Sequence, residues 1–172
     1  MRKILVAVSG SSAVWKSSDL INRLRENPEN EIHVVITGAA SQFVQPLMYQ
    51  TLTLNHVFVD EDDKALELAR LSGEIDLFIL IPATANTIGK IAHGINDNRL
   101  TEAVFSLKEE TPKYFCPAMN EAMYVSVPVQ ENLDRLKAKG FIEIPPIIGM
   151  LSSGKTALGS LEKVENILKI IK

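Results

Sequence analysis

Three short segments of this sequence carry small and hydrogen-bonding residues directly after an apolar run. The first reads Ser9-Gly10-Ser11-Ser12-Ala13. Gly10 permits a tight turn and a close backbone approach, while Ser11 and Ser12 can cap a following helix and donate to an anion at its positive end. One glycine does not make the dinucleotide-binding fingerprint. The segment therefore indicates either a helix cap or an anion site.

The other two segments both begin with proline. Residues 82–87 read Pro-Ala-Thr-Ala-Asn-Thr, and this mixture of small side chains with hydroxyl and amide groups suits a planar polar ligand. Residues 117–120 read Pro-Ala-Met-Asn. Here Asn120 can donate to a carboxylate, and Met119, with Met123 just beyond, can pack on an aromatic ring. A single segment of this kind is more often a turn than a binding site. Whether these segments form a site therefore depends on whether the fold brings them together.

Apolar runs and amphipathic segments alternate along the chain. The runs 4–8, 32–36, 77–81 and 114–116 are typical of strands buried on both faces. Helical periodicity extends over 18–25, 66–71, 88–95, 129–139 and 161–171, with Ser160 the expected N-cap of the last helix. The alternation predicts a flavodoxin-like, Rossmann-type α/β fold: a doubly wound parallel sheet in three layers. No linker or repeat interrupts it, so we expect one domain over residues 1–172.

Folds of this class bind ligands at the carboxyl ends of their strands. The segments that follow the four expected strands begin at Ser9, Thr37, Pro82 and Pro117, and each contains small or hydrogen-bonding residues. Because the ends of parallel strands meet at one edge of the sheet, we expect these segments to form a shared pocket there.

The overall composition argues against several classes of function. The 172 residues are 46% hydrophobic and 23% charged, which is ordinary for a globular chain. The net charge of −3 argues against a nucleic-acid partner. The apolar stretch after Lys3 is too short for a signal peptide or a membrane span. With a lone cysteine, Cys116, expected to be a buried core thiol, the sequence predicts a cytoplasmic protein without membrane contact.

Three further patterns suggest other interpretations. Residues 149–156 match the P-loop spacing of nucleotide hydrolases, which requires a strand before the motif and a helix directly after it. Pro145-Pro146 argues against a central strand there. The acidic run 60–63 can suggest a metal, but an acidic helix N-terminus is the simpler interpretation, and we expect no metal site. Lys113, after the charged residues 108–110, is expected in a solvated turn.

Taken together, these segments resemble those of the homo-oligomeric flavin-containing cysteine decarboxylases. That family includes phosphopantothenoylcysteine decarboxylase of coenzyme A synthesis and the enzymes that oxidatively decarboxylate the C-terminal cysteine of lantibiotic precursor peptides. Flavin prenyltransferases are further relatives. The resemblance covers nearly the whole chain and is carried by residues 8–13, 43–47, 50–52, 82–87, 91–98 and 117–124.

The resemblance implies FMN as cofactor and a homo-oligomer, either a trimer or a dodecamer built from trimers. It implies that Asn120 holds the carboxylate of a substrate ending in cysteine, small molecule or peptide, with Met123 beside it. The implied chemistry is oxidation of the cysteine side chain with FMN as electron sink, followed by loss of CO2. The residues placed near FMN are Gly10, Ser11, Ser12, Thr37, Phe43, Thr84, Ala85, Asn86 and Met119.

The sequence departs from the family pattern at two functional positions. On a C-terminal flap at 151–155, Ser153 stands where the coenzyme A enzyme has a reactive cysteine, and a serine hydroxyl has no accessible redox couple. The second position is that of an essential histidine in the family. In this chain it corresponds to Leu68 by ungapped counting, or to Ala65 if residues 72–74 are an insertion, so neither alignment gives a histidine. We therefore keep three functions open: a phosphopantothenoylcysteine decarboxylase-like enzyme, which we favour; a peptidyl-cysteine decarboxylase that stops at the enethiol; and an FMN-binding protein without this activity.

Overall fold

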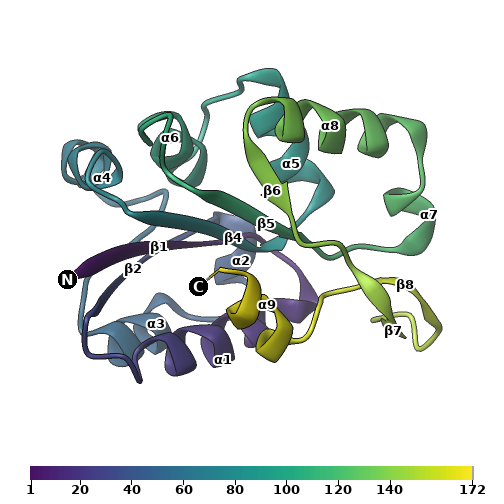
Figure 1. The fold of residues 1–172 in the computed structure, drawn as a ribbon, viewed down its shortest axis with the longest axis horizontal. Coiled ribbons are helices and arrows are strands. Elements are labelled where there is room, and N and C mark those ends of the chain that lie inside the picture. The colour runs from purple at the N-terminus through teal and green to yellow at the C-terminus, as the bar shows by residue number, and fades with distance from the viewer. Residues whose placement is uncertain (172) are drawn as a thin grey trace.

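A parallel six-stranded sheet organises the chain, and a computed structural model describes residues 1–171 of it (Figure 1). The sheet strands are β1 (Arg2–Val8), β2 (Asn30–Ile36), β3 (Val57–Phe58), β4 (Leu77–Ala83), β5 (Lys113–Pro117) and β6 (Phe141–Glu143). A separate hairpin pairs β7 (Ile147–Met150) with β8 (Thr156–Ser160). The helices are η1 (Ser12–Val14), α1 (Trp15–Leu24), α2 (Gly38–Ser41), α3 (Pro46–Thr53), α4 (Ala65–Ser72), α5 (Ala85–His93), α6 (Arg99–Phe105), α7 (Glu121–Tyr124), α8 (Val127–Ala138) and α9 (Val164–Ile170).

The strand order β3-β2-β1-β4-β5-β6 confirms the doubly wound, flavodoxin- or Rossmann-like fold that the sequence predicts. All five neighbouring pairs are parallel. Ile4 pairs with Ile32 on one side and with Leu77 on the other, so β1 lies at the centre. The order reverses between β1 and β4, and the crevice at such a switch point is where open α/β sheets bind ligands.

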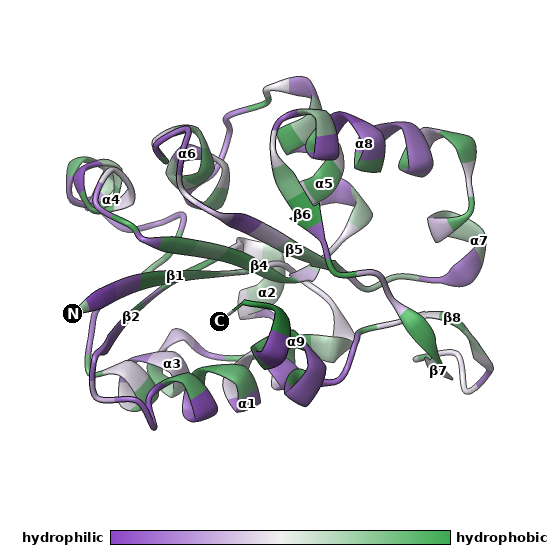
Figure 2. Cartoon of the chain, in the orientation of Figure 1, coloured by the Kyte–Doolittle hydropathy of each residue, from purple (hydrophilic) through white to green (hydrophobic). Residues whose placement is uncertain are grey.

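Helices cover both faces of the sheet (Figure 1). On one face α1, α3 and α9 pack over a core that includes Leu20, Tyr49 and Ile167. On the other face α4, α5, α6 and α8 pack over a second core that includes Leu68 and Leu133. Because β1 and β4 are covered on both sides, their sequences are apolar almost throughout instead of alternating, as the colouring of Figure 2 shows.

The hairpin excludes the P-loop interpretation of residues 149–156. This segment is the end of β7, a turn and the first residue of β8, and an antiparallel strand follows the motif where a P-loop needs a helix. The same pairing corrects the expected start of the last helix. Ser160 belongs to β8, where it pairs with Ile147, and α9 begins only at Val164 with Lys163 as its N-cap.

Two expectations about charged residues are also wrong. The acidic run 60–63 forms a turn before α4 and not the first turn of that helix, which begins at Ala65. Lys113 is not solvated: it is 8% exposed, and its Nζ donates to the carbonyl oxygens of Glu109 at 2.7 Å and Thr111 at 3.0 Å. Cys116 is fully buried, as predicted.

Within residues 1–171 no helix has the length and apolar character that crossing a membrane requires. In the same part of the chain no group of acidic, histidine or cysteine side chains is arranged to hold a metal ion.

Candidate functional site

Two cavities lie at the carboxyl edge of the sheet, on either side of the loop that follows β1. The first, which we call the switch-point cavity, has a volume of about 360 Å³. Its lining residues are Gly10, Thr37, Gly38, Ala39, Asp60, Thr84, Asn86, Thr87, Lys90, Asp97 and Asn98. The second, the hairpin cavity, has a volume of about 330 Å³ and lies under the β7–β8 hairpin. Its polar lining comes from Ser11, Ser12, Lys16, Asn120, Ser152, Ser153 and Ser160.

Ser9 holds the two loops of the switch point together. Its hydroxyl donates to the carbonyl oxygen of Pro82 at 2.7 Å and accepts the backbone N–H of Thr84 at 2.9 Å. The side chain is 1% exposed, so neither bond competes with water. The hydroxyl therefore sets the spacing between the end of β1 and the start of α5, and this spacing defines one wall of the switch-point cavity.

Gly10 brings the next loop equally close. A Cβ at this position would lie 2.6 Å from the Cβ of Ala39 and 2.8 Å from its carbonyl carbon. Both distances are shorter than real contacts allow, so only glycine lets the loop after β1 pass the start of α2. Small residues in both loops thus leave the cavity open at the centre of the sheet edge.

The N-terminus of α5 points its free backbone donors at this cavity. Thr84 is the N-cap, and its hydroxyl accepts the backbone N–H of Thr87 at 3.4 Å. The first N–H groups of a helix, here those of Ala85 and Asn86, have no partner within the helix. With the helix dipole they favour an anion at the rim of the cavity.

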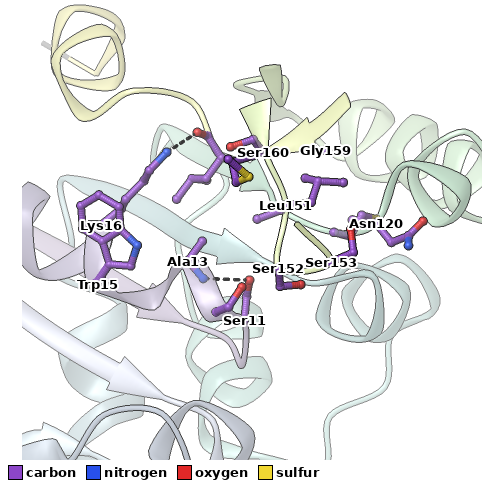
Figure 3. Close-up of a pocket in the computed structure, with 15 residues that line it drawn as sticks. Ser11, Ala13, Trp15, Lys16, Asn120, Leu151, Ser152, Ser153, Gly159 and Ser160 are labelled. Atoms are coloured by element: carbon purple, nitrogen blue, oxygen red, sulfur yellow. Dashed lines mark hydrogen bonds between the residues drawn. The ribbon is translucent and has the colours of Figure 1, made fainter. Parts of the chain in front are cut away.

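In the hairpin cavity Asn120 presents a free amide donor. Its side-chain oxygen accepts the backbone N–H of Ala122 at 2.8 Å and caps α7. This bond uses the amide oxygen, so the NH2 group keeps both of its donors. Figure 3 shows Asn120 at one end of the cavity, Trp15 and Lys16 at the other, and Ser152 and Ser153 between them.

Lys16 supplies the cationic end of this cavity. Its Nζ donates to the carbonyl oxygen of Leu161 at 2.5 Å and lies 5.8 Å from the centroid of the Trp15 ring. Burial lowers the pKa of the ammonium group, and the carboxylates of Glu162 and Glu165 oppose that shift. The bond to the Leu161 carbonyl uses one of the three N–H donors of the ammonium, which leaves the others for an incoming anion.

The hairpin brings Ser153 to the cavity but provides no thiol. Cys116, in β5, is fully buried, and burial raises the pKa of its thiol far above the ordinary range, which makes it unreactive. No histidine of residues 1–171 lines either cavity. At the two alternative positions for the family histidine, Ala65 begins α4 and Leu68 is fully buried in the core.

Most of the predicted site residues meet at the two cavities. Gly10, Thr37, Thr84 and Asn86 line the switch-point cavity, and Ser11, Ser12, Met119, Asn120 and Ser153 line the hairpin cavity. Ala85 is the first residue of α5 and packs against the core. Phe43, 58% exposed, and Met123, 48% exposed, line neither cavity in this single copy of the chain, so their roles stay predictions.

Sequence reasoning missed three residues that build the site. Lys16 is the only cation that lines the hairpin cavity within the described part of the chain, and Asp60 lines the switch-point cavity. Gly159 passes directly over Met119 and attaches the hairpin to the rest of the site. A lysine four residues after a Ser-Ser pair was a usable signal for Lys16, because it falls one turn after the serines, at the start of α1.

This arrangement is that of the doubly wound α/β proteins, which bind ligands in the crevices at their strand tips. The comparison with protein families is more specific. The flavoprotein family model matches residues 1–172, and the chain belongs to this family.

Similar proteins include a probable phosphopantothenoylcysteine decarboxylase and a coenzyme A biosynthesis protein. The chain is 38% identical over 174 residues to the probable phosphopantothenoylcysteine decarboxylase of Streptococcus mutans, covering 99% of this chain and 97% of that protein. It is 36% identical over 173 residues to the coenzyme A biosynthesis bifunctional protein CoaBC of Bacillus subtilis. That alignment covers 98% of this chain but only 42% of the longer relative.

Solved structures agree with this family. A phosphopantothenoylcysteine decarboxylase mutant complexed with pantothenoylaminoethenethiol superposes with a TM-score of 0.86 at 29% identity, covering 99% of this chain and 96% of that one. The FMN-dependent cysteine decarboxylase SpaF gives a TM-score of 0.82 at 29% identity, covering 99% of this chain and 95% of that one. Relatives of this chain thus include decarboxylases of cysteine-containing substrates, of which SpaF is FMN-dependent.

Proposed function

We propose that this protein is an FMN-dependent decarboxylase of a cysteine-derived carboxylate, with phosphopantothenoylcysteine as the leading substrate class. One observation carries the proposal: two cavities share the loop after β1, one suited to a phosphorylated ring and the other to a dianionic substrate. Because the loop is shared, a substrate in the hairpin cavity would lie next to a cofactor in the switch-point cavity.

The residues present fit FMN. The free backbone donors at the start of α5 and the side chains of Thr37 and Asn86 line the switch-point cavity and suit its phosphate. The small residues Gly10 and Ala39 let the loop after β1 pass close to α2 at the edge of this cavity, because a Cβ at Gly10 would clash with Ala39. When bound there, FMN supplies a two-electron acceptor for oxidation of the substrate's thiol-bearing carbon.

The hairpin cavity fits a substrate with an anion at each end. The amide NH2 of Asn120 would hold the carboxylate that leaves as CO2, and the ammonium of Lys16 would hold the phosphate at the far end. Trp15 lies beside Lys16 and would shield the chain between the two anions from water. The similarity to the Streptococcus mutans protein supports the same substrate.

Ser153 favours a second candidate, a peptidyl-cysteine decarboxylase. A decarboxylase that returns its electrons to the product needs a proton and electron relay at the flap, and Ser153 offers a hydroxyl where a thiol would serve. The one thiol of the chain, Cys116, is buried in the core. An enzyme of this design would release an enethiol and pass its electrons to another oxidant such as oxygen.

An oligomer is part of the proposal. Apolar side chains are exposed on α3 and on the turns at both of its ends, and a cluster of such side chains is typical of an interaction surface. They are Phe43, Leu47, Met48 and Leu54. A trimer, alone or assembled into a dodecamer, would cover them and bring Phe43 of one copy toward the cofactor of another. Cytoplasmic location belongs to the same proposal, because the family's substrates are metabolic or nascent-peptide thiols.

The test combines cofactor loading with product analysis. Protein purified with excess FMN is desalted, its flavin absorbance is measured, and its mass in solution is determined by light scattering. It is then incubated with phosphopantothenoylcysteine or with a peptide ending in cysteine, and the products are analysed by mass spectrometry.

Each result selects one function. Loss of CO2 alone from phosphopantothenoylcysteine supports the leading proposal with an intact reductive step. Loss of CO2 together with two hydrogens shows a product that stays an enethiol, and reaction of the peptide alone identifies the second candidate. Flavin that is retained with neither substrate changed would leave an FMN-binding protein without this activity, and protein that takes up no flavin would refute the proposal altogether.

A further inference from the structure

Asp60 forms part of the wall of the switch-point cavity and joins two helix N-termini. Its Oδ2 accepts the backbone N–H of Gly38, the first residue of α2, at 3.0 Å. Its Oδ1 accepts the backbone N–H of Arg99, the first residue of α6, at 2.9 Å. Both oxygens therefore act as acceptors, which is the bonding pattern of an ionised carboxylate held in one orientation.

No cation in the described residues 1–171 neutralises this carboxylate through an ion pair. The guanidinium of Arg99 donates instead to Glu102 and to the carbonyl oxygen of Asp62. The one lysine that lines the cavity, Lys90, forms two bonds with Asp97, at 2.8 and 2.7 Å. The charges of Lys90 and Asp97 largely cancel, so Asp60 gives the wall of the cavity a net negative charge.

We propose that Asp60 lowers the reduction potential of the flavin that the switch-point cavity holds, an inference that rests on the proposed function. Reduction by two electrons makes the flavin ring more electron-rich and, at neutral pH, negatively charged. A fixed negative charge in a partly water-excluded wall disfavours that form relative to the neutral oxidised ring. Asp60 thereby keeps the resting protein oxidised and ready to accept electrons from a thiol substrate.

The same argument explains which end of the cavity receives the phosphate. The carboxylate of Asp60 repels a phosphate group, whereas the start of α5, on the same cavity, attracts it. The cofactor's ring, and not its phosphate, therefore faces Asp60. This orientation is what makes Asp60 effective on the potential.

The experiment measures the midpoint potential of bound FMN by reductive titration against a reference dye. The variants are Asp60→Asn and, as a control, Asp63→Asn, which removes the same charge from an exposed residue of the same acidic run. Asn98→Asp is the reciprocal variant. It adds a carboxylate to the same cavity and keeps an acceptor for the α6 N-cap bond to the Thr101 backbone N–H.

We expect Asp60→Asn to favour the reduced form at least about tenfold over the oxidised form, a rise of about 30 mV for a two-electron couple. Asn98→Asp should shift the potential downward, and Asp63→Asn should leave it unchanged. A purely structural role for Asp60 would weaken binding of oxidised and reduced FMN equally and leave the potential where it was, which would overturn the inference while the proposed function stands.

Failures of folding or loading are also decisive. If Asp60→Asn does not retain flavin, the direction of the Asn98→Asp shift alone supports or refutes the inference. If the unmodified protein takes up no FMN, both the proposed function and this inference are refuted.

Discussion

A Cβ on Gly159 would lie 2.0 Å from the carbonyl oxygen of Met119. In the other direction, the backbone N–H of Met119 donates to the carbonyl oxygen of Gly159 at 3.1 Å. Gly159 also has a φ of +126°, a conformation that residues with a side chain rarely adopt. The β7–β8 hairpin is thus attached to the loop that carries Asn120 by a main-chain contact that only glycine permits.

We expect Gly159→Ala to detach this hairpin. The contact cannot persist with a Cβ, so the hairpin cavity loses one wall while the switch-point cavity keeps all its residues. The predicted result is substrate binding weakened at least about tenfold with FMN retention unchanged. The measurements are KM or substrate Kd, flavin absorbance after desalting, and protease sensitivity of the hairpin turn.

Gly154→Ala is the matched control. Gly154 also has a positive φ, +77°, but a Cβ there would meet nothing within 4 Å. It should cost about 1 kcal/mol of local strain and leave the hairpin in place. Equal losses of substrate binding in both variants would show that backbone strain, and not the contact with Met119, is responsible.

Ser9→Ala should loosen the cofactor cavity. The change leaves the carbonyl of Pro82 and the N–H of Thr84 buried without this partner, at a cost of about 1–3 kcal/mol in the free energy of unfolding. The loops after β1 and β4 would separate, so FMN affinity should fall together with stability. Denaturant unfolding of the flavin-free protein and fluorescence titration with FMN measure the two effects.

Ser106→Ala serves as the comparison for Ser9→Ala. The Ser106 hydroxyl donates to the Glu102 carbonyl within its own helix and touches neither cavity. This variant should change stability by a few tenths of a kcal/mol and leave FMN affinity intact. An Ser9→Ala protein with normal FMN affinity would contradict the role assigned to this hydroxyl.

The central strands and most helices were predictable because their patterns are local. The run Ile4–Val8 is apolar throughout and lies within β1, buried on both faces as the pattern indicated. The hairpin was missed because β7 and β8 are short and half-exposed and follow Pro145-Pro146, which reads as irregular chain. Ser160 was predicted to be a helix N-cap because serine favours that position. In the structure it instead pairs with Ile147 in the hairpin.

The site was predictable only in part for a similar reason. Loops such as 82–87 can be recognised from their composition and from their position after a strand. The role of Asp60 depends on Arg99, and that of Lys16 on Leu161. Contacts between residues so far apart in the sequence leave no local pattern. The charged residues that line the two cavities could therefore be identified only from the structure.

Lys16→Met should weaken binding of the substrate's phosphate without affecting binding of its carboxylate. The ammonium makes a charge-assisted contact worth about 1.5–3 kcal/mol to a phosphate, so KM for phosphopantothenoylcysteine should rise at least about tenfold. The dephosphorylated substrate should be affected little. Lys169→Met, on the outer surface of α9, is the control. An equal rise for both substrates would show that Lys16 does not contact the phosphate.

The pH dependence of KM for the phosphorylated substrate follows from the lowered pKa of Lys16. Because burial lowers that pKa, the ammonium loses its proton at a lower pH than an ordinary lysine. KM for the phosphorylated substrate should therefore begin to rise at a lower alkaline pH than ordinary lysine titration would give. Lys16→Arg stays protonated, so its KM should stay flat over the same range. If KM of Lys16→Arg rises at alkaline pH as it does in the unmodified protein, the rise is due to another group.

Asp62→Asn should reduce stability at neutral pH but not in acid. Burial opposes ionisation of Asp62, but hydrogen bonds from His56 and from the backbone N–H groups of Val59 and Lys64 outweigh it and hold the pKa below its ordinary value. A lowered carboxyl pKa adds stability above the unfolded-state pKa, near 4, and that stability is lost as pH falls through the folded-state pKa. Unfolding at several pH values measures the difference, with Asp63→Asn, an exposed residue of the same turn, as the control.

Asn120→Asp tests the carboxylate site with almost no change in shape. Asp keeps the oxygen that accepts the Ala122 N–H, so the α7 cap and the stability should survive. It replaces the amide donor with a negative charge that repels the substrate carboxylate, and kcat/KM should fall about 100-fold or more, equivalent to at least about 2.7 kcal/mol. Asn166→Asp, on α9 and outside both cavities, is the matched control. Because Asn120→Asp leaves the switch-point cavity intact, FMN should still bind, and activity close to that of the unmodified protein would place the substrate carboxylate elsewhere.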